Sequence, residues 1–242
     1  MKLIRNLLSA LNPLAKSSAK KPASPFGGYK KRTMTAKELV LSAASLVPEG
    51  GMVYNVWVKH EIDAGFREEL MLAVSKLNDC RYCSWGHHEW AHIAGVSEEE
   101  LAHIEQMDPT NFDRKKWLAI SFVRELVTAK FGKVSKDLMK EMKVNYSARE
   151  IQEIILVAKV MDIANRGANT WDAMLSRLQG KPAAESKILD EAVLSAVFLT
   201  AAPLVILFLA RASKRPFTEI ARSLIDYTKH IEDRDNKGQF SR

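Results

Sequence analysis

Two cysteines and a histidine stand at a spacing that would place their side chains on one face of a helix. They are Cys80, Cys83 and His87, in the segment CRYCSWGH. Residues three, four and seven positions apart share a helix face, so a helix beginning near Asn78 or Asp79 would align all three. Cys80 would then lie in the first turn, where free N–H groups and the helix dipole stabilise a negative charge. A free thiol has a pKa of about 8.5, and this environment favours the thiolate at neutral pH.

The segment before the cysteines offers a carboxylate. Glu68 precedes Cys80 by twelve residues, in a segment over about 66–77 that we expect to be helical. A helical hairpin would fold Glu68 back against the helix of the cysteines. There its carboxylate could accept a proton from one thiol while His87 serves the other. Two thiols one turn apart can also close on each other, so the chemistry expected of these residues is thiol–disulfide exchange with proton transfer.

Helix signals dominate the chain after residue 34. A cap at Asp113 predicts a helix that ends near Gly132. Gly180, together with Pro182, predicts the end of the helix that holds Trp171. No stretch alternates apolar and polar residues with the period of a strand, so we expect an all-α fold. Three residue pairs form capping boxes before apolar runs: Thr35 with Glu38, Ser97 with Glu100, and Ser147 with Glu150.

The charge is distributed unevenly along the chain. The net charge is +7, yet residues 1–37 carry nine Lys or Arg and no acidic residue, residues 38–210 sum to −5, and residues 211–242 sum to +3. A nucleic-acid-binding protein usually carries its basic residues on the folded face, so we expect no nucleic-acid partner. Residues 1–34 are predicted to be a basic amphipathic arm and linker, which suits an anionic membrane surface. Because Arg5 interrupts its apolar run, this arm is a poor secretory signal, while a transit peptide is left open. We expect a cytoplasmic protein that can attach to the membrane.

The C-terminal region, residues 181–242, contains an apolar segment. Residues 192–210 are nineteen residues without a charge. At about 1.5 Å per residue, such a helix nearly matches the roughly 30 Å hydrocarbon core of a bilayer, and a membrane helix tolerates the kink that Pro203 would cause. A buried helix at an oligomer interface explains the same pattern. We therefore expect contact with a membrane, either as a full span or as a shallow insertion. Packing of this helix in a homo-oligomer is the alternative that stays open.

The cysteine motif resembles the alkyl hydroperoxidase D (AhpD)-like branch of the carboxymuconolactone decarboxylase family. The resemblance rests on Glu68, eleven residues, CRYC, three residues and His87, followed by AGVSEEEL. It implies an AhpD-like all-α domain over residues 35–180 and commonly a homo-oligomer. It also implies a thiol peroxidase that reduces small hydroperoxides and is itself reduced by a disulfide-exchange protein or small thiol.

The resemblance also implies roles for the four residues. Cys83 would be the peroxidatic thiol and Cys80 the resolving thiol, with Glu68 and His87 as the proton relay. The only redox group required is the Cys80–Cys83 disulfide, so we expect no other cofactor and no metal. The best-known peroxidases of the family carry a histidine where this chain has Tyr82. Tyrosine is a much weaker base than histidine, so the chain departs from the family pattern at this position.

Other interpretations of the motif stay open. Cys80, Cys83 and His87, with His88 or His92 as a further ligand, could bind zinc in a structural or interaction protein. A non-redox enzyme of the decarboxylase type is the second alternative, although that branch of the family lacks the cysteine pair. His88 and His92 could also bind a metal, but we expect them on a solvated face. A polar patch of Arg166, Asn169 and Asp172 could line a pocket or satisfy the end of a helix.

Overall fold

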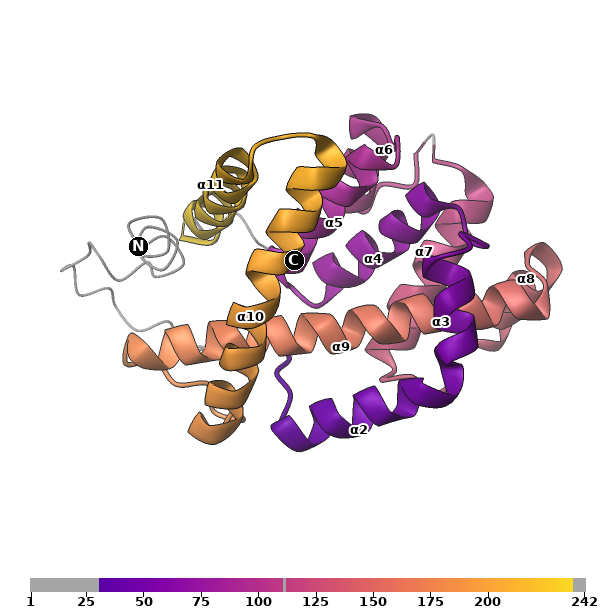
Figure 1. The fold of residues 1–242 in the computed structure, drawn as a ribbon. Helices are drawn as coiled ribbons and strands as arrows, with labels where there is room; N and C mark the ends of the chain where they lie inside the picture. The colour runs from indigo at the N-terminus through magenta and orange to yellow at the C-terminus, as the bar shows by residue number, and fades with distance from the viewer. Residues whose placement is uncertain (1–30, 111, 237–242) are drawn as a thin grey trace. The chain divides into compact units, whose positions relative to one another are not determined.

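The computed structural model describes residues 31–110 and 112–236 (Figure 1). The regular secondary structure of these residues is helical, with no strand, which confirms the all-α prediction. Most of the basic arm predicted over residues 1–34 lies outside the described residues, so that prediction stays open.

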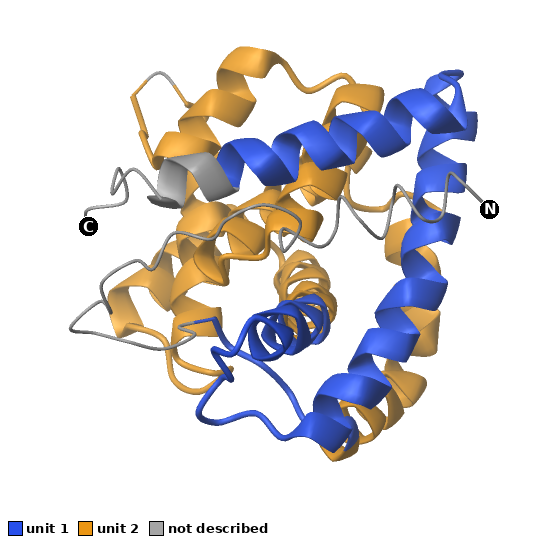
Figure 2. Cartoon of the chain, turned by 90° about the vertical axis from the view of Figure 1, so that its left-hand side faces the viewer, with its two compact units in different colours: residues 1–36, 167–242 blue, residues 37–166 orange. Residues whose placement is uncertain are grey.

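The chain divides into two compact units (Figure 2). One unit is residues 37–166, and the other combines residues 1–36 with residues 167–242. The boundary falls inside a long helix, α9 (Ala148–Leu178), which contributes to both units. Both cysteines and the proposed relay residues belong to the unit of residues 37–166.

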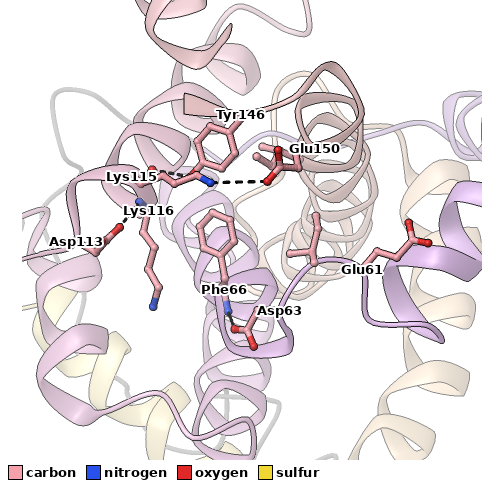
Figure 3. A pocket seen from close by; sticks show the side chains of 10 residues that line it. Glu61, Asp63, Phe66, Asp113, Lys115, Lys116, Tyr146 and Glu150 are labelled. Atoms are coloured by element: carbon pink, nitrogen blue, oxygen red, sulfur yellow. Dashed lines mark hydrogen bonds and ion pairs between the residues drawn. The ribbon is translucent and has the colours of Figure 1, made fainter. Parts of the chain in front are cut away.

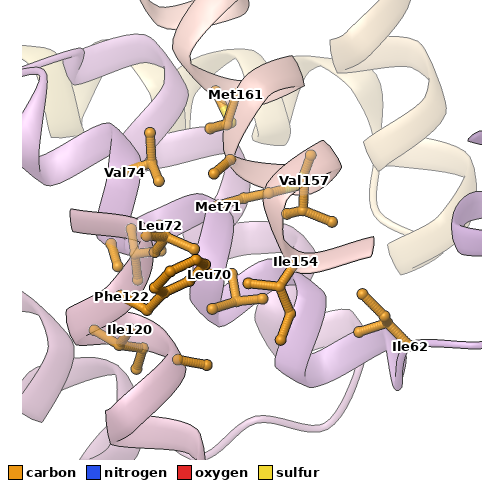
Figure 4. Close-up of a cluster of buried hydrophobic side chains, with 14 of the residues drawn as sticks. Ile62, Leu70, Met71, Leu72, Val74, Ile120, Phe122, Ile154, Val157 and Met161 are labelled. Carbon is orange, nitrogen blue, oxygen red and sulfur yellow. The ribbon is translucent and has the colours of Figure 1, made fainter. Parts of the chain in front are cut away.

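The unit of residues 37–166 is built around helix α4 (Ala64–Leu77), which packs against α5, α6 and α7. Because α4 is surrounded, its side chains from Leu70 to Val74 are all buried. Phe122 and Ile154 belong to the same apolar core (Figure 4). Besides the first part of α9, the other helices of this unit are α2 (Ala36–Leu46), the 3-10 turn η2 (Val47–Glu49), α3 (Gly50–Trp57), α5 (Arg81–Ile93), α6 (Glu98–Gln106), α7 (Arg114–Thr128) and α8 (Lys136–Asn145).

Side-chain caps fix where several of these helices begin. Ser97 and Glu100 form a reciprocal capping box at the start of α6, as predicted. Ser147 and Glu150 exchange the corresponding hydrogen bonds at the start of α9, at 2.7 and 3.2 Å. Asp113 caps α7 by accepting from the backbone N–H of Lys116, although α7 ends at Thr128 and not near residue 132.

A tight turn connects α4 to α5, and the two helices form the expected hairpin. The turn consists of Asn78, Asp79 and Cys80, and Asp79 adopts a positive φ of 53°. The buried amide of Asn78 donates to Asp162 of α9 at 2.9 Å, which ties the turn to the core. The backbone N–H of Cys80 donates to the carbonyl of Ser75 at 3.0 Å. These bonds hold the start of α5 against α4.

The second unit contains the end of α9, together with α10 (Ile188–Ser213) and α11 (Phe217–Asn236), which pack against each other. Arg177 of α9 binds both carboxylate oxygens of the buried Glu191 of α10, at 2.6 and 2.9 Å. The rings of Trp171 and Phe198 stack at 5.7 Å. Helix α9 ends before Gly180, as predicted.

Helix α10 is long and apolar enough to cross a membrane. An 18-residue window within it has a mean hydropathy of 2.5, and only 22% of that window is buried. Its exposed apolar side chains include Val197, Leu204, Leu207 and Phe208. The apolar segment predicted over residues 192–210 therefore forms part of one continuous helix, with Pro203 inside it.

The polar patch on α9 is not at the end of a helix, which corrects one of the two interpretations of the sequence. Helix α9 continues to Leu178. Within the unit of residues 37–166, Arg166 forms an ion pair with Glu38 at 2.7 Å. Within the other unit, Asp172 forms one with Lys31 at 2.9 Å. The patch therefore makes tertiary ion pairs and does not satisfy terminal carbonyls.

Candidate active site

A glutamate–histidine pair joins the two helices of the hairpin. Glu68 lies on the second turn of α4 and His87 on α5, with His87 Nδ1 2.7 Å from Glu68 Oε2. The side chains are 6% and 18% exposed, so the contact is largely removed from water. The fold thus brings Glu68 to the helix that Cys80 caps and that contains Cys83.

Arg67 completes the environment of this carboxylate. Its Nε and Nη2 donate to Glu68 Oε1 at 3.1 and 2.9 Å, and its Nη1 donates to the carbonyl of Val56 at 3.1 Å. Burial alone would raise the pKa of Glu68, but the hydrogen bonds and charges of His87 and Arg67 outweigh it and hold that pKa below its usual value. Glu68 is therefore an ionised, doubly bound carboxylate at neutral pH. Sequence reasoning missed Arg67, although it is the immediate neighbour of Glu68.

The two cysteines form a disulfide at the start of α5. Cys80 is the N-cap residue, so it lies just before the first turn and not within it, and Arg81 is the first helical residue. Sγ of Cys80 accepts the backbone N–H of Cys83 at 3.3 Å. Cys80 is fully buried, whereas Cys83 is partly exposed. Cys83 and His87 are four residues apart in α5 and therefore share one helix face.

Tyr82 occupies the position between the cysteines. Its ring is buried, and its hydroxyl accepts a hydrogen bond from Arg81 Nη2 at 2.9 Å. The guanidinium of Arg81 also lies over the ring, 4.9 Å from the centroid. The arrangement favours a packing role for Tyr82 over the role of a proton donor.

A second buried carboxylate follows Glu68 directly. Glu69 is fully buried and accepts from Lys116 Nζ at 3.0 Å through Oε1, while its Oε2 has no hydrogen-bond partner among the described residues. Burial raises the pKa of Glu69 to about 7, although Lys116 acts in the opposite direction. Because the folded protein binds this proton more tightly than the unfolded chain does, protonation of Glu69 stabilises the fold. The usual carboxyl pKa is near 4.5, so this contribution to the free energy of unfolding is complete below about pH 4.5. It is lost as the pH rises through about 7.

A cavity of about 290 Å³ lies beside the beginning of α4 (Figure 3). None of the four residues of the predicted site lines it, so it is separate from the cysteine pair. Its walls carry both signs of charge, and Lys115 pairs with Glu150 across part of it at 3.7 Å. The lining residues are Glu61, Ile62, Asp63, Phe66, Asp113, Lys115, Lys116, Tyr146, Glu150 and Ile154.

The described residues also contain a group that could hold a metal ion, and it adds one residue to the two histidines considered in the sequence. It consists of His88, His92 and Glu98. Sequence reasoning placed the two histidines on a solvated face and did not include Glu98. The zinc alternative built on the cysteine pair is not available in the disulfide form, because a disulfide sulfur is not a thiolate ligand.

Fold and site together define an all-α protein in which a helical hairpin carries a CxxC disulfide and a buried Glu–His pair. A sequence model of the carboxymuconolactone decarboxylase family matches residues 51–125. The matched segment runs from α3 to α7 and contains Glu68, Cys80, Cys83 and His87. This part of the chain is thus similar to a family that includes enzymes, as the motif predicted. No match was found among curated proteins or among solved structures.

Proposed function

We propose that this protein is a thiol-dependent peroxidase of the AhpD-like type, which reduces small hydroperoxides through Cys80 and Cys83. The observation that carries the proposal is the buried Glu68–His87 pair, at 2.7 Å, on the same hairpin as the disulfide. A structural cysteine pair has no need of a buried carboxylate–histidine pair on the same hairpin, whereas a peroxidatic thiol must lose a proton and its leaving group must gain one.

In the proposed reaction, the thiolate of Cys83 attacks the terminal oxygen of the hydroperoxide. The O–O bond breaks, Cys83 becomes a sulfenic acid, and the alkoxide leaves as an alcohol after it receives a proton. Cys83 is assigned this step because it is the partly exposed cysteine and shares a helix face with His87. The N–H groups of the first turn of α5 favour the negative charge on sulfur.

The thiol of Cys80 then attacks the sulfenic sulfur, forms the disulfide and releases water. This role suits a buried residue, because Cys80 needs to reach only Cys83 and not the peroxide. A disulfide-exchange protein or small dithiol returns both cysteines to thiols and leaves as a disulfide itself. Its thiolate would attack the sulfur of Cys83, which is the accessible one.

Glu68 and His87 supply and remove the protons in this scheme. When Nδ1 of His87 donates to Glu68, Nε2 is left as the base that takes the proton of a thiol and returns it to the leaving alkoxide. Glu68 keeps this tautomer and orientation, since its other oxygen is held by Arg67. The proposal needs no metal and no organic cofactor.

The test is a titration of free thiols. The reduced protein should present two thiols, and one equivalent of hydroperoxide should remove both, with a Cys80–Cys83 disulfide found by peptide mass spectrometry. Consumption of the peroxide should match the loss of thiols. Thiols that stay unreactive toward both peroxide and alkylating reagent would contradict the proposal, and tightly bound zinc in the reduced protein would support a structural site in its place.

We also propose that α10 attaches the protein to a membrane. Its apolar side chains are exposed, and Arg211, Lys214 and Arg215 follow at its C-terminal end, where they can meet anionic headgroups. The competing occupant is a second copy of the chain in a homo-oligomer.

The double variant Leu204→Glu/Leu207→Glu distinguishes these environments. The wild-type protein should float with anionic vesicles, whereas the double variant should stay in solution, because two carboxylates oppose insertion. Val144→Glu is the control, because Val144 is also an exposed apolar residue but lies on α8. The other outcome is that the wild-type protein is an oligomer that is soluble without detergent and does not float, while the double variant is a monomer. That result would show that α10 is an oligomer interface.

A further inference from the structure

Two histidines and a glutamate converge where α5 ends and α6 begins. His88 and His92 are one turn apart on α5, with ring centroids 4.9 Å apart, and Glu98 is the first residue of α6. Nε2 of His92 lies 2.7 Å from Glu98 Oε1, and Nε2 of His88 lies 3.6 Å from Glu98 Oε2. One ligand atom from each side chain lies within 4.8 Å of the others.

The backbone holds this group in place. Helix α5 is followed by Gly95, whose φ of +86° lets the chain reverse at little steric cost. Val96 is buried against α4, where its Cγ2 would lie 2.9 Å from a Cβ added at Gly65. The Ser97–Glu100 capping box then fixes the direction of α6 and with it the position of Glu98. The three side chains therefore project from a short, anchored helix–turn–helix.

We propose that His88, His92 and Glu98 bind one divalent transition-metal ion, of which Zn²⁺ is the best fit. Imidazole nitrogens and a carboxylate oxygen are ligands that Zn²⁺ prefers, and three protein ligands leave a fourth position for water. Two histidines at i and i+4 on one helix are a common way to supply two of them. The ion would connect the end of α5 to the start of α6 at a single point.

The surroundings of the histidines favour a cation. The ring of His88 is partly buried in the neighbourhood of several carboxylates. The carboxylates of Glu105, Glu98 and Glu89 are the acidic groups whose charges act on this ring. Glu105 is already paired with Lys76 at 2.9 Å, so a bound metal ion would compensate chiefly the charge of Glu98.

This site is independent of the redox site. His87, the neighbour of His88 in the sequence, is engaged with Glu68 and faces α4. The metal site uses neither cysteine, so it does not rest on the proposed peroxidase activity. It also differs from the zinc alternative of the motif, which required Cys80 and Cys83 as thiolates.

The experiment uses the full chain, without an affinity tag, in its disulfide form, so that no thiolate can act as a ligand. After treatment with a chelator, the protein is titrated with ZnCl₂ by calorimetry and with CoCl₂ by absorption spectroscopy. We expect one ion per chain. Glu98→Gln and His92→Ala should each weaken zinc binding by more than about tenfold, because each removes a direct ligand.

Two matched variants serve as controls. Glu99→Gln removes the next carboxylate of the same helical turn, and His103→Ala removes a histidine of α6 whose Nδ1 is 3.6 Å from Asp108. Both should bind zinc as the wild type does. Zinc should also raise the midpoint of thermal unfolding of the wild type and of both controls, but not that of Glu98→Gln.

The proposal is overturned if the oxidised wild-type protein shows no saturable zinc binding. It is equally overturned if Glu98→Gln binds as tightly as Glu99→Gln does, because Glu98 would then be only a surface partner of His92. Failure of the proposed peroxidase function would leave these results unchanged, since the measurement involves neither peroxide nor thiols.

Discussion

Replacing Cys83 by serine is expected to reduce hydroperoxide consumption to the uncatalysed background. Serine has nearly the same size, but its hydroxyl is not ionised at neutral pH and cannot attack a peroxide oxygen at a useful rate. The fold should persist, because Cys83 is only partly buried. The measurement is the initial rate of hydroperoxide loss in the presence of a dithiol, with circular dichroism to verify the helical content.

Cys80→Ser is the matched variant, since it makes the same substitution one turn earlier. It should react once with hydroperoxide in the absence of reductant, but it should not turn over with a reductant that acts only on disulfides, because it cannot form the Cys80–Cys83 disulfide. The sulfenic acid on Cys83 would then persist long enough to be trapped with a carbon-nucleophile probe and located by mass spectrometry. The two variants thus separate attack on the peroxide from resolution of the sulfenic acid.

Two results would contradict this assignment. If the sulfenic acid appears on Cys80 in the Cys83→Ser variant, the roles of the two cysteines are reversed. If a full enzymatic activity of the decarboxylase type persists when both cysteines are serine, the chemistry of the site is not redox chemistry at all.

The parts of the fold that follow from local interactions could be predicted from the sequence. The capping boxes at Ser97 and Ser147 act within four residues, so the starts of α6 and α9 were predictable. The hairpin of α4 and α5 followed from helix signals on both sides of a short turn. The start of α5 was displaced slightly, because Cys80 caps the helix with its own side chain.

Features that depend on tertiary contacts could not be predicted from the sequence. Arg67 binds Glu68 and the carbonyl of Val56, and nothing in the spacing of the motif predicts that second contact. Glu98 reaches His92 only because the turn at Gly95 reverses the chain, so the histidines alone suggested a solvated face. Position relative to other helices, and not residue type, decides these cases.

Replacing Glu68 by glutamine is expected to slow peroxide reduction by about 100-fold or more, the lower range for losing a positioned proton-transfer group. Glutamine keeps the size of the side chain and an oxygen that can accept from Arg67. It removes the negative charge that holds His87 in the tautomer with a free Nε2, so the pH–rate profile should change as well as the maximal rate. Because Arg67 loses a buried counter-charge, the free energy of unfolding should fall by up to about 3 kcal/mol. Rates should be measured between about pH 5 and about pH 8, and chemical denaturation from about pH 3 to about pH 8, because the contribution of Glu68 to stability is lost only below about pH 4.5.

Glu69→Gln is the control, because Glu69 is the adjacent buried carboxyl and pairs with Lys116 and not with His87. Its peroxide rate should equal that of the wild type. In the wild type, the two carboxyl groups make the free energy of unfolding depend on pH in opposite directions. The lowered pKa of Glu68 gives the wild type a stabilisation that disappears as the pH falls, whereas the raised pKa of Glu69, about 7, gives one that disappears as the pH rises. Glu68→Gln should therefore remove the loss of stability at low pH, and Glu69→Gln the loss of stability as the pH rises through about 7. Equal peroxide rates in Glu68→Gln and Glu69→Gln would show that Glu68 supports the hairpin without taking part in proton transfer.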